Sequence, residues 1–83
     1  MMLSPEEYFA YHLQGKTARQ IRTRIASLKA QIRQLEKQVA NPQEYLEAWM
    51  ICPDPQTQLE MTRLYLQTAT SALLQTEKRQ SKP

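Results

Sequence analysis

The stretch that decides the fold is residues 17–40, which reads TARQIRTRIASLKAQIRQLEKQVA. Its apolar residues recur at alternating steps of three and four, the heptad spacing of a helix that packs along one side against another helix. We name this set the seam, and it consists of Ala18, Ile21, Ile25, Leu28, Ile32, Leu35 and Val39. The pattern predicts one long amphipathic helix whose seam needs a partner helix.

Helix-start signals divide the rest of the chain. Four positions carry a short polar side chain that can cap a helix, and proline follows three of them at the first helical position. The four caps are Ser4, Thr17, Asn41 and Asp54. They predict helices near residues 5–14, 17–40, 42–51 and 55–78, and they leave residues 79–83 as a flexible basic tail.

The composition indicates one small helical domain. A chain of 83 residues makes a single domain at most, and a content of one glycine favours helix. No segment alternates between apolar and polar residues as a half-buried strand does. We predict an all-α fold, with an antiparallel, coiled-coil-like helical hairpin and two short flanking helices in a small bundle. Residues 1–78 form the single helical domain of this prediction.

Two partners for the seam are open. The last helix, 55–78, is apolar over a wide arc, so it can cover the seam within one chain and still leave surface for other contacts. A parallel homodimer is the alternative, since branched residues and leucine at alternating seam positions suit two-stranded coils. That dimer would place Arg24 opposite Lys29 of the second copy, where like charges are unfavourable. The hairpin is therefore the favoured prediction.

The reactive side chains argue against an enzyme. Cys52 is the only cysteine, which excludes a disulfide within the chain. His12 and Cys52 are the only soft metal ligands and lie forty residues apart, so we expect no metal site. Neither has a neighbour at helical spacing that would activate it, and Gly15 alone does not make a phosphate-binding loop. We predict no catalytic residue, no cofactor and no metal.

The sequence carries no membrane signature. No apolar run approaches the ~18 residues that a transmembrane helix needs. The start of the chain, Met1–Glu7, is acidic and holds no apolar signal region. We expect no membrane span and a cytoplasmic location.

Positive charge is concentrated in one segment. Residues 16–40 hold seven basic residues and one acidic residue, whereas the whole chain has a net charge of +3. This asymmetry suggests an acidic protein partner or a nucleic acid, although a basic helix face is also an ordinary solvated surface. Residues 15–24, GKTARQIRTR, resemble the turn and recognition helix of Myb-like domains. The resemblance implies a DNA-binding, helix-turn-helix-like regulator that uses the 16–37 helix and the basic residues Arg19, Arg22, Arg24, Lys29 and Arg33.

A second resemblance covers residues 17–75 in outline. A long amphipathic helix, the motif NPQEY at 41–45 and a second amphipathic helix are similar to the small co-chaperones of type III secretion needle subunits. The resemblance implies a cytoplasmic helical hairpin that joins a larger partner protein and keeps the needle subunit soluble. This chain adds the helix at 5–14 and a longer connection over 49–55.

Protein binding is the favoured function. We predict a non-enzymatic adaptor or chaperone-like module that meets a partner protein through apolar helix surface. The expected contacts are Tyr45, Trp49, Met61, Leu64, Tyr65 and Leu66. Large aromatic side chains at the end of a hairpin suit the anchors of an interface, although Tyr45 and Trp49 can equally cap the protein's own core. A homo-oligomeric structural coiled coil is a further alternative.

Overall fold

The computed structural model describes residues 2–80, and every regular element in that range is helical. In chain order the elements are α1 (Pro5–Tyr8), the π-helix η1 (Phe9–Leu13), α2 (Ala18–Ala40), the 3-10 helix η2 (Pro42–Tyr45), α3 (Leu46–Trp49) and α4 (Pro55–Gln80). Since η1 continues α1 and α3 continues η2, these elements form four helical segments close to the four that were predicted. The all-α prediction is confirmed for residues 2–80.

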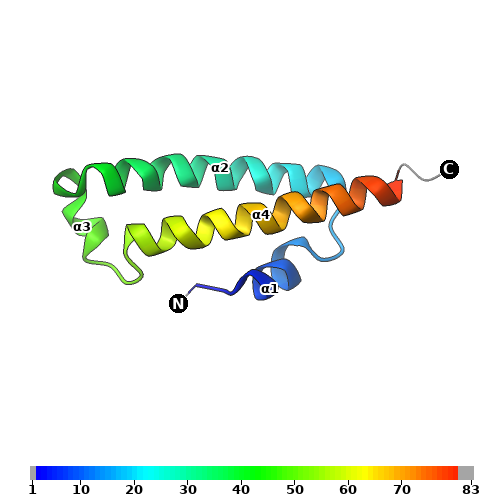
Figure 1. Ribbon diagram of the computed structural model, residues 1–83, viewed down its shortest axis with the longest axis horizontal. Helices are drawn as coiled ribbons and strands as arrows, with labels where there is room; N and C mark the ends of the chain where they lie inside the picture. Colours follow the sequence, from blue (N-terminus) through cyan, green and yellow to red (C-terminus); the bar gives the residue numbers. More distant parts are fainter. Residues whose placement is uncertain (1, 81–83) are drawn as a thin grey trace.

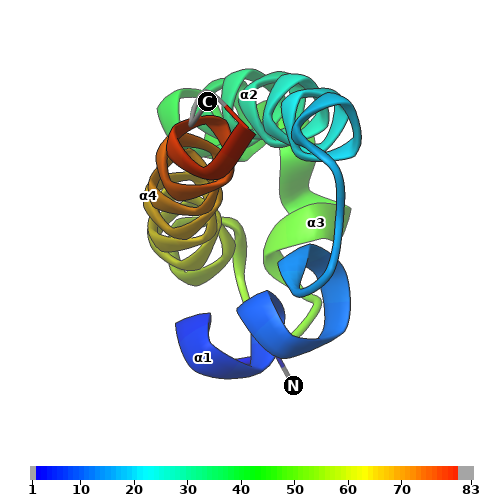
Figure 2. The ribbon, with the colours of Figure 1, turned by 90° about the vertical axis from the view of Figure 1, so that its right-hand side faces the viewer.

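The two long helices form the body of the molecule. α2 and α4 lie side by side and run in opposite directions, and η2 and α3 make the turn between them at one end (Figure 1). The molecule is elongated, with principal extents of 54 × 20 × 14 Å. Viewed along its length, α1 lies below α4 on the side away from α2 (Figure 2). The coiled-coil-like character of the α2–α4 pair stays a prediction.

Three of the predicted caps are present. The hydroxyl of Ser4 accepts a hydrogen bond from the Glu7 backbone N–H, and that of Thr17 accepts one from Gln20, each at 3.2 Å. In both cases the side chain three residues on bonds back to the backbone N–H of the cap residue, which completes a capping box. Asp54 caps α4 by accepting from the Thr57 N–H at 2.8 Å.

The fourth predicted cap, Asn41, caps the C-terminus of α2 and not the N-terminus of the helix that follows. Asn41 makes no side-chain bond to the N-terminus of η2. Instead its backbone N–H and its side-chain amide both donate to the Lys37 carbonyl, at 3.0 and 3.2 Å, so Asn41 closes the C-terminus of α2. Without a capped start, the following four residues form a 3-10 turn, and α-helix begins at Leu46.

Some residues of the seam are buried, and the others are only partly buried. Ala18, Ile21, Leu28 and Leu35 are buried, whereas Ile25, Ile32 and Val39 are partly exposed. The main core cluster joins α1, η1, α2 and α4, and its members are Tyr8, Leu13, Ile21, Leu28, Tyr65, Ala69 and Ala72. One side of the α2–α4 pair is therefore covered by the N-terminal segment through Tyr8 and Leu13.

Three C-terminal helix ends differ from the prediction, since the first segment ends at Leu13, the third at Trp49 and α4 at Gln80. α4 continues through Gln80, so Arg79 and Gln80 of the predicted tail are helical, and 81–83 lie outside the described residues. In the first segment the helix widens after Tyr8, and the Gln14 N–H bonds to the carbonyl of Phe9 at 2.8 Å, five residues back. Gly15 then turns the chain with φ of +76°, the left-handed region that glycine enters without strain.

Candidate protein-binding surface

Three large apolar side chains are exposed together in the turn between the long helices. Leu46, Met50 and Ile51 are 63%, 84% and 62% exposed. We name them the end patch. Isolated exposed apolar residues are ordinary on protein surfaces, but three within six residues of one turn form a local concentration. The end patch is the strongest candidate for a binding surface in the described part of the chain.

The end patch stands on an anchored turn. Trp49 is half-buried, and its indole N–H donates to the Gln38 carbonyl at 3.0 Å, which ties α3 to the last turn of α2. The Met50 N–H bonds to the carbonyl of Leu46 at 3.2 Å, so these two side chains are held one helical turn apart. The turn then leaves α3 through a cis peptide bond between Cys52 and Pro53.

The six predicted interface residues lie in different parts of the structure. Tyr45 and Trp49 are half-buried next to the end patch, whereas Met61 and Leu66 are half-buried against the core. Leu64 is 40% exposed on α4. Tyr65 is only 6% exposed, because its ring stacks on Tyr8 inside the core, so it is removed from the candidate surface. Of the six, Tyr45 and Trp49 lie beside the end patch, whereas Met61, Tyr65 and Leu66 belong to the core cluster or pack against it.

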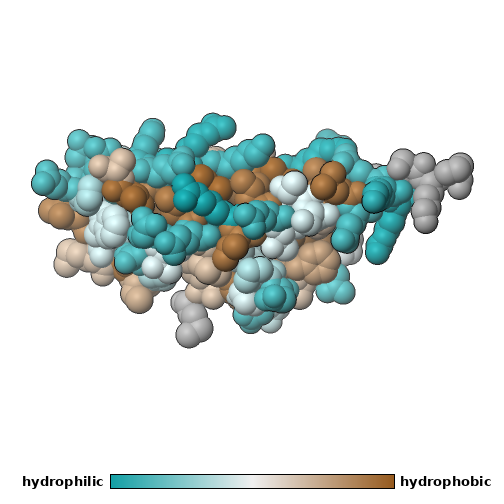
Figure 3. All heavy atoms as spheres, in the orientation of Figure 1, coloured by the Kyte–Doolittle hydropathy of each residue, from teal (hydrophilic) through white to brown (hydrophobic). Residues whose placement is uncertain are grey.

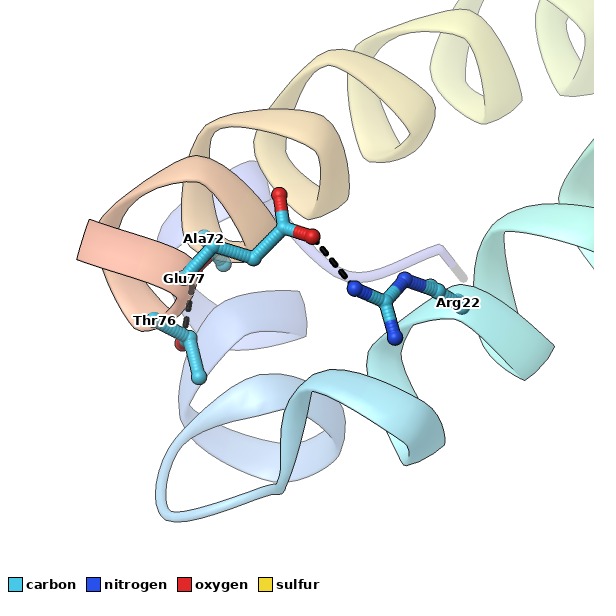
Figure 4. A network of polar contacts seen from close by, with 4 residues as sticks. All are labelled: Arg22, Ala72, Thr76 and Glu77. Carbon is cyan, nitrogen blue, oxygen red and sulfur yellow. Dashed lines mark hydrogen bonds and ion pairs between the residues drawn. The ribbon is translucent and has the colours of Figure 1, made fainter. Parts of the chain in front are cut away.

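The five predicted basic residues do not form one surface. Arg19 and Arg24 line a hollow where the N-terminal segment meets α2, together with His12, Lys16, Gln20 and Thr23. Lys29 and Arg33 are exposed further along α2. Arg22 instead points across to α4, where it pairs with Glu77 (Figure 4).

Two ion pairs tie α2 to α4 near their opposite ends. One is the Arg22–Glu77 pair, and Figure 4 shows that Thr76, next to Glu77, bonds its hydroxyl to the Ala72 carbonyl of its own helix. The other joins Arg63 of α4 to Glu36 of α2 at 3.3 Å. All four charged side chains keep much of their solvent exposure, so water screens each pair and its contribution to stability is small.

Within residues 2–80, three ionisable groups have shifted pKa values. Burial raises the pKa of the Tyr8 phenol, while the charge of nearby Arg24 acts in the opposite direction. Burial also raises the pKa of Tyr65, and the carboxylate of Glu7 adds to that effect. The hydrogen bond from the Thr57 backbone lowers the pKa of Asp54. These shifts belong to the core and to a helix cap, and none lies in the end patch.

The two reactive side chains, His12 and Cys52, lie in different surroundings. The ring of His12 lies 4.8 Å from the ring of Tyr8, and Cys52 is an exposed free thiol beside the end patch. Within residues 2–80, no three His, Cys, Asp or Glu side chains gather in a way that could hold a metal ion. Over the same range, no helix has both the length and the apolar character needed to cross a membrane.

Comparisons with protein-family models, with curated proteins and with solved structures found no match for this chain. The candidate surface therefore stands on its geometry. The sequence predicted interface anchors at this end of the hairpin, but the predicted residues were Tyr45 and Trp49, which are partly buried in the turn. The spacing of Leu46 and Met50, one helical turn apart in a segment too short to bury both, was the available signal for the exposed pair.

Proposed function

We propose that this protein is a non-enzymatic helical module that binds a partner protein through the end patch. The observation that carries the proposal is the exposure of Leu46, Met50 and Ile51 on a turn whose backbone is held in place by Trp49. Apolar side chains on an ordered turn suit binding, because little conformational freedom is lost when a partner covers them. The proposal keeps the adaptor or chaperone-like role and the cytoplasmic location expected from the sequence.

This proposal includes a role similar to that of type III secretion co-chaperones. Its support is the pairing of two long helices across a short helical turn that contains the NPQEY motif at 41–45. In that role, the partner would be a helical secretion protein that needs its apolar surface covered.

Site-specific photo-cross-linking in native cell extract tests the proposal. A photo-reactive amino acid replaces Met50 in one sample and Tyr11 in the control, since Tyr11 is similarly exposed at 71% but lies in the N-terminal segment, away from the turn and from the α2 and α4 surfaces. We expect a defined protein adduct from position 50 and none from position 11. Equal labelling from both positions, or none from position 50, would contradict the proposed surface. Mass measurement of the adduct gives the partner and its stoichiometry.

Nucleic-acid binding is the second candidate function. Its support is the hollow lined by Lys16, Arg19 and Arg24, a gathering of positive charge from two segments of the chain. If DNA binds there, affinity falls steeply with salt, because phosphate contacts release counterions. Replacing Arg19 and Arg24 by alanine should then weaken binding, whereas Lys37→Ala should have less effect. Salt-independent binding, or equal losses in all variants, would rule this candidate out.

The homo-oligomeric coiled coil is less favoured. It needs the α2 seam as its contact surface, but α4 and the N-terminal segment already bury Ile21 and Leu28 within one chain. A sedimentation measurement of the mass over a range of concentrations tests this alternative, which predicts a concentration-dependent dimer.

A further inference from the structure

The α2–α4 pair has one side that no other described segment covers. On the first side, Tyr8 and Leu13 pack into the core cluster with Tyr65. On the other side, Ile25 and Ile32 of α2 and Leu66 and Leu73 of α4 are partly exposed. The space-filling view shows apolar surface running between the two long helices on this side (Figure 3). We name it the open face.

Helical spacing defines the two borders of the open face. On each helix five residues recur at steps of three and four, so each set forms one strip along its helix. The α2 strip is Arg22, Ile25, Lys29, Ile32 and Glu36, and the α4 strip is Arg63, Leu66, Thr70, Leu73 and Glu77. The first residue of each strip pairs with the last residue of the other, which fixes both strips to the same side of the helix pair.

The open face has the length of a short helix. The two ion pairs are separated by fourteen positions on α2 and by fourteen on α4. At 1.5 Å per residue, this corresponds to about 20 Å, or roughly four helical turns. Between the ion pairs, each strip presents two branched apolar side chains, so the surface repeats with the period of a helix that would lie along it.

The charge of the open face indicates the charge of the partner that it would bind. Residues 23–35 of α2 contain no acidic residue, and residues 64–76 of α4 contain no charged residue. Lys29 lies within the α2 strip and Arg33 follows it by one turn, and both are exposed. These positive charges beside the apolar strips therefore favour a partner with acidic side chains. A second copy of this chain is disfavoured, because its own open face carries the same cations.

We propose that the open face binds an acidic amphipathic helix of a partner protein. Apolar residues of that helix, at steps of three and four, cover Ile25, Ile32, Leu66 and Leu73. Its carboxylates lie beside Lys29 and Arg33. This inference rests on the proposed protein-binding function and specifies the chemical class of the partner. The end patch then provides a separate contact at the turn.

The probe for this proposal is a synthetic amphipathic peptide of about sixteen residues, or ~24 Å as a helix. It carries leucine at steps of three and four and glutamate on both flanks. The control peptide keeps every leucine and replaces each glutamate by lysine. Binding to the full-length protein is measured by fluorescence anisotropy at low and at physiological salt. We expect the glutamate peptide to bind at least about tenfold more tightly than the lysine peptide.

Matched charge reversals locate the site. Lys29→Glu with Arg33→Glu changes the open face, and Lys16→Glu with Arg19→Glu makes the same change in net charge elsewhere. All four side chains are exposed, so neither pair removes core packing. The first pair should weaken the glutamate peptide about tenfold, and the second less than about twofold. Equal losses from both pairs would overturn the proposal.

Amide chemical shifts of the unmodified protein give a measurement that depends on no variant. The peptide should shift the amides of both strips, and shifts confined to the end patch would overturn the proposal. Failure here is distinct from failure of the proposed function. If position 50 cross-links a partner while the glutamate peptide binds no better than its lysine control, protein binding stands and the open-face proposal fails.

Discussion

The ring of Tyr8 stacks on the ring of Tyr65, with centroids 4.3 Å apart and planes 7° from parallel. This contact brings the short N-terminal segment onto α4 and closes the core cluster on one side of the long helices. The Tyr65 hydroxyl also donates to the Leu3 carbonyl, so the same residue holds the chain just before α1. The Tyr8 hydroxyl is buried and meets no partner with hydrogen-bond geometry among residues 2–80, although the charge of Arg24 is near enough to act on its pKa.

Removing the two hydroxyls should therefore have unequal effects. Tyr65→Phe keeps the stack but loses the bond to Leu3 and leaves that carbonyl unpaired, which should cost about 1 kcal/mol of unfolding free energy. Tyr8→Phe removes a buried hydroxyl that makes no such bond, so stability should stay within about 0.5 kcal/mol of the parent protein. Urea denaturation of both variants measures the difference, and equal losses would contradict the assigned bond.

The same stack should limit stability in alkali. Burial raises the pKa of Tyr8 and Tyr65 in the folded protein above the ordinary value of 10.0. A raised folded pKa means that this contribution to stability is fully present below pH 10 and is lost as pH rises through the folded pKa. We expect the melting temperature to fall above pH 10.

The matched variants separate the tyrosine contribution from general alkaline effects. The double variant Tyr8→Phe with Tyr65→Phe should show a shallower fall in melting temperature above pH 10. Tyr11→Phe is the control, because the ring of Tyr11 is exposed. If the double variant loses stability with pH as steeply as the Tyr11 variant, the two buried phenols are not responsible.

The sequence predicted the helix starts well because a capping box is local. Thr17 and Gln20 are three residues apart, and both bonds form within the first turn of α2. Asn41 was placed at the wrong helix end, since the same side chain serves either an N-terminus or the carbonyl of Lys37. The π-helical widening after Tyr8 depends on hydrogen-bond register, which apolar periodicity does not encode.

The candidate surface was only partly predictable. Heptad spacing identified the seam, but it treats Ile25 and Leu28 as equivalent, whereas the N-terminal segment covers only the side on which Leu28 lies. The burial of Tyr65 follows from its long-range contact with Tyr8, 57 positions away in the chain. Contacts of that separation depend on how the N-terminal segment folds back, and no local pattern specifies that.

The ion pairs at the ends of the open face should contribute little to stability. Arg63 and Glu36 are about half exposed, so solvent screens their attraction. A double-mutant cycle with Arg63→Ala and Glu36→Ala should give a coupling free energy of about 0.5 kcal/mol or less, decreasing with salt. A salt-independent coupling above about 1.5 kcal/mol would show that the pair has a larger structural role.

The end patch should be separable from the fold. Leu28 is buried in the core cluster, so Leu28→Ala leaves a cavity and should cost about 2–5 kcal/mol of unfolding free energy. Leu46 and Met50 are mostly exposed, so Leu46→Ser with Met50→Ser should change that free energy by less than about 1 kcal/mol.

The serine variant should nevertheless abolish the adduct formed from a photo-reactive residue at position 51. Large destabilisation by the serine variant would mean that these side chains support the turn. An adduct that survives at full yield in a folded serine variant would mean that the partner does not depend on them.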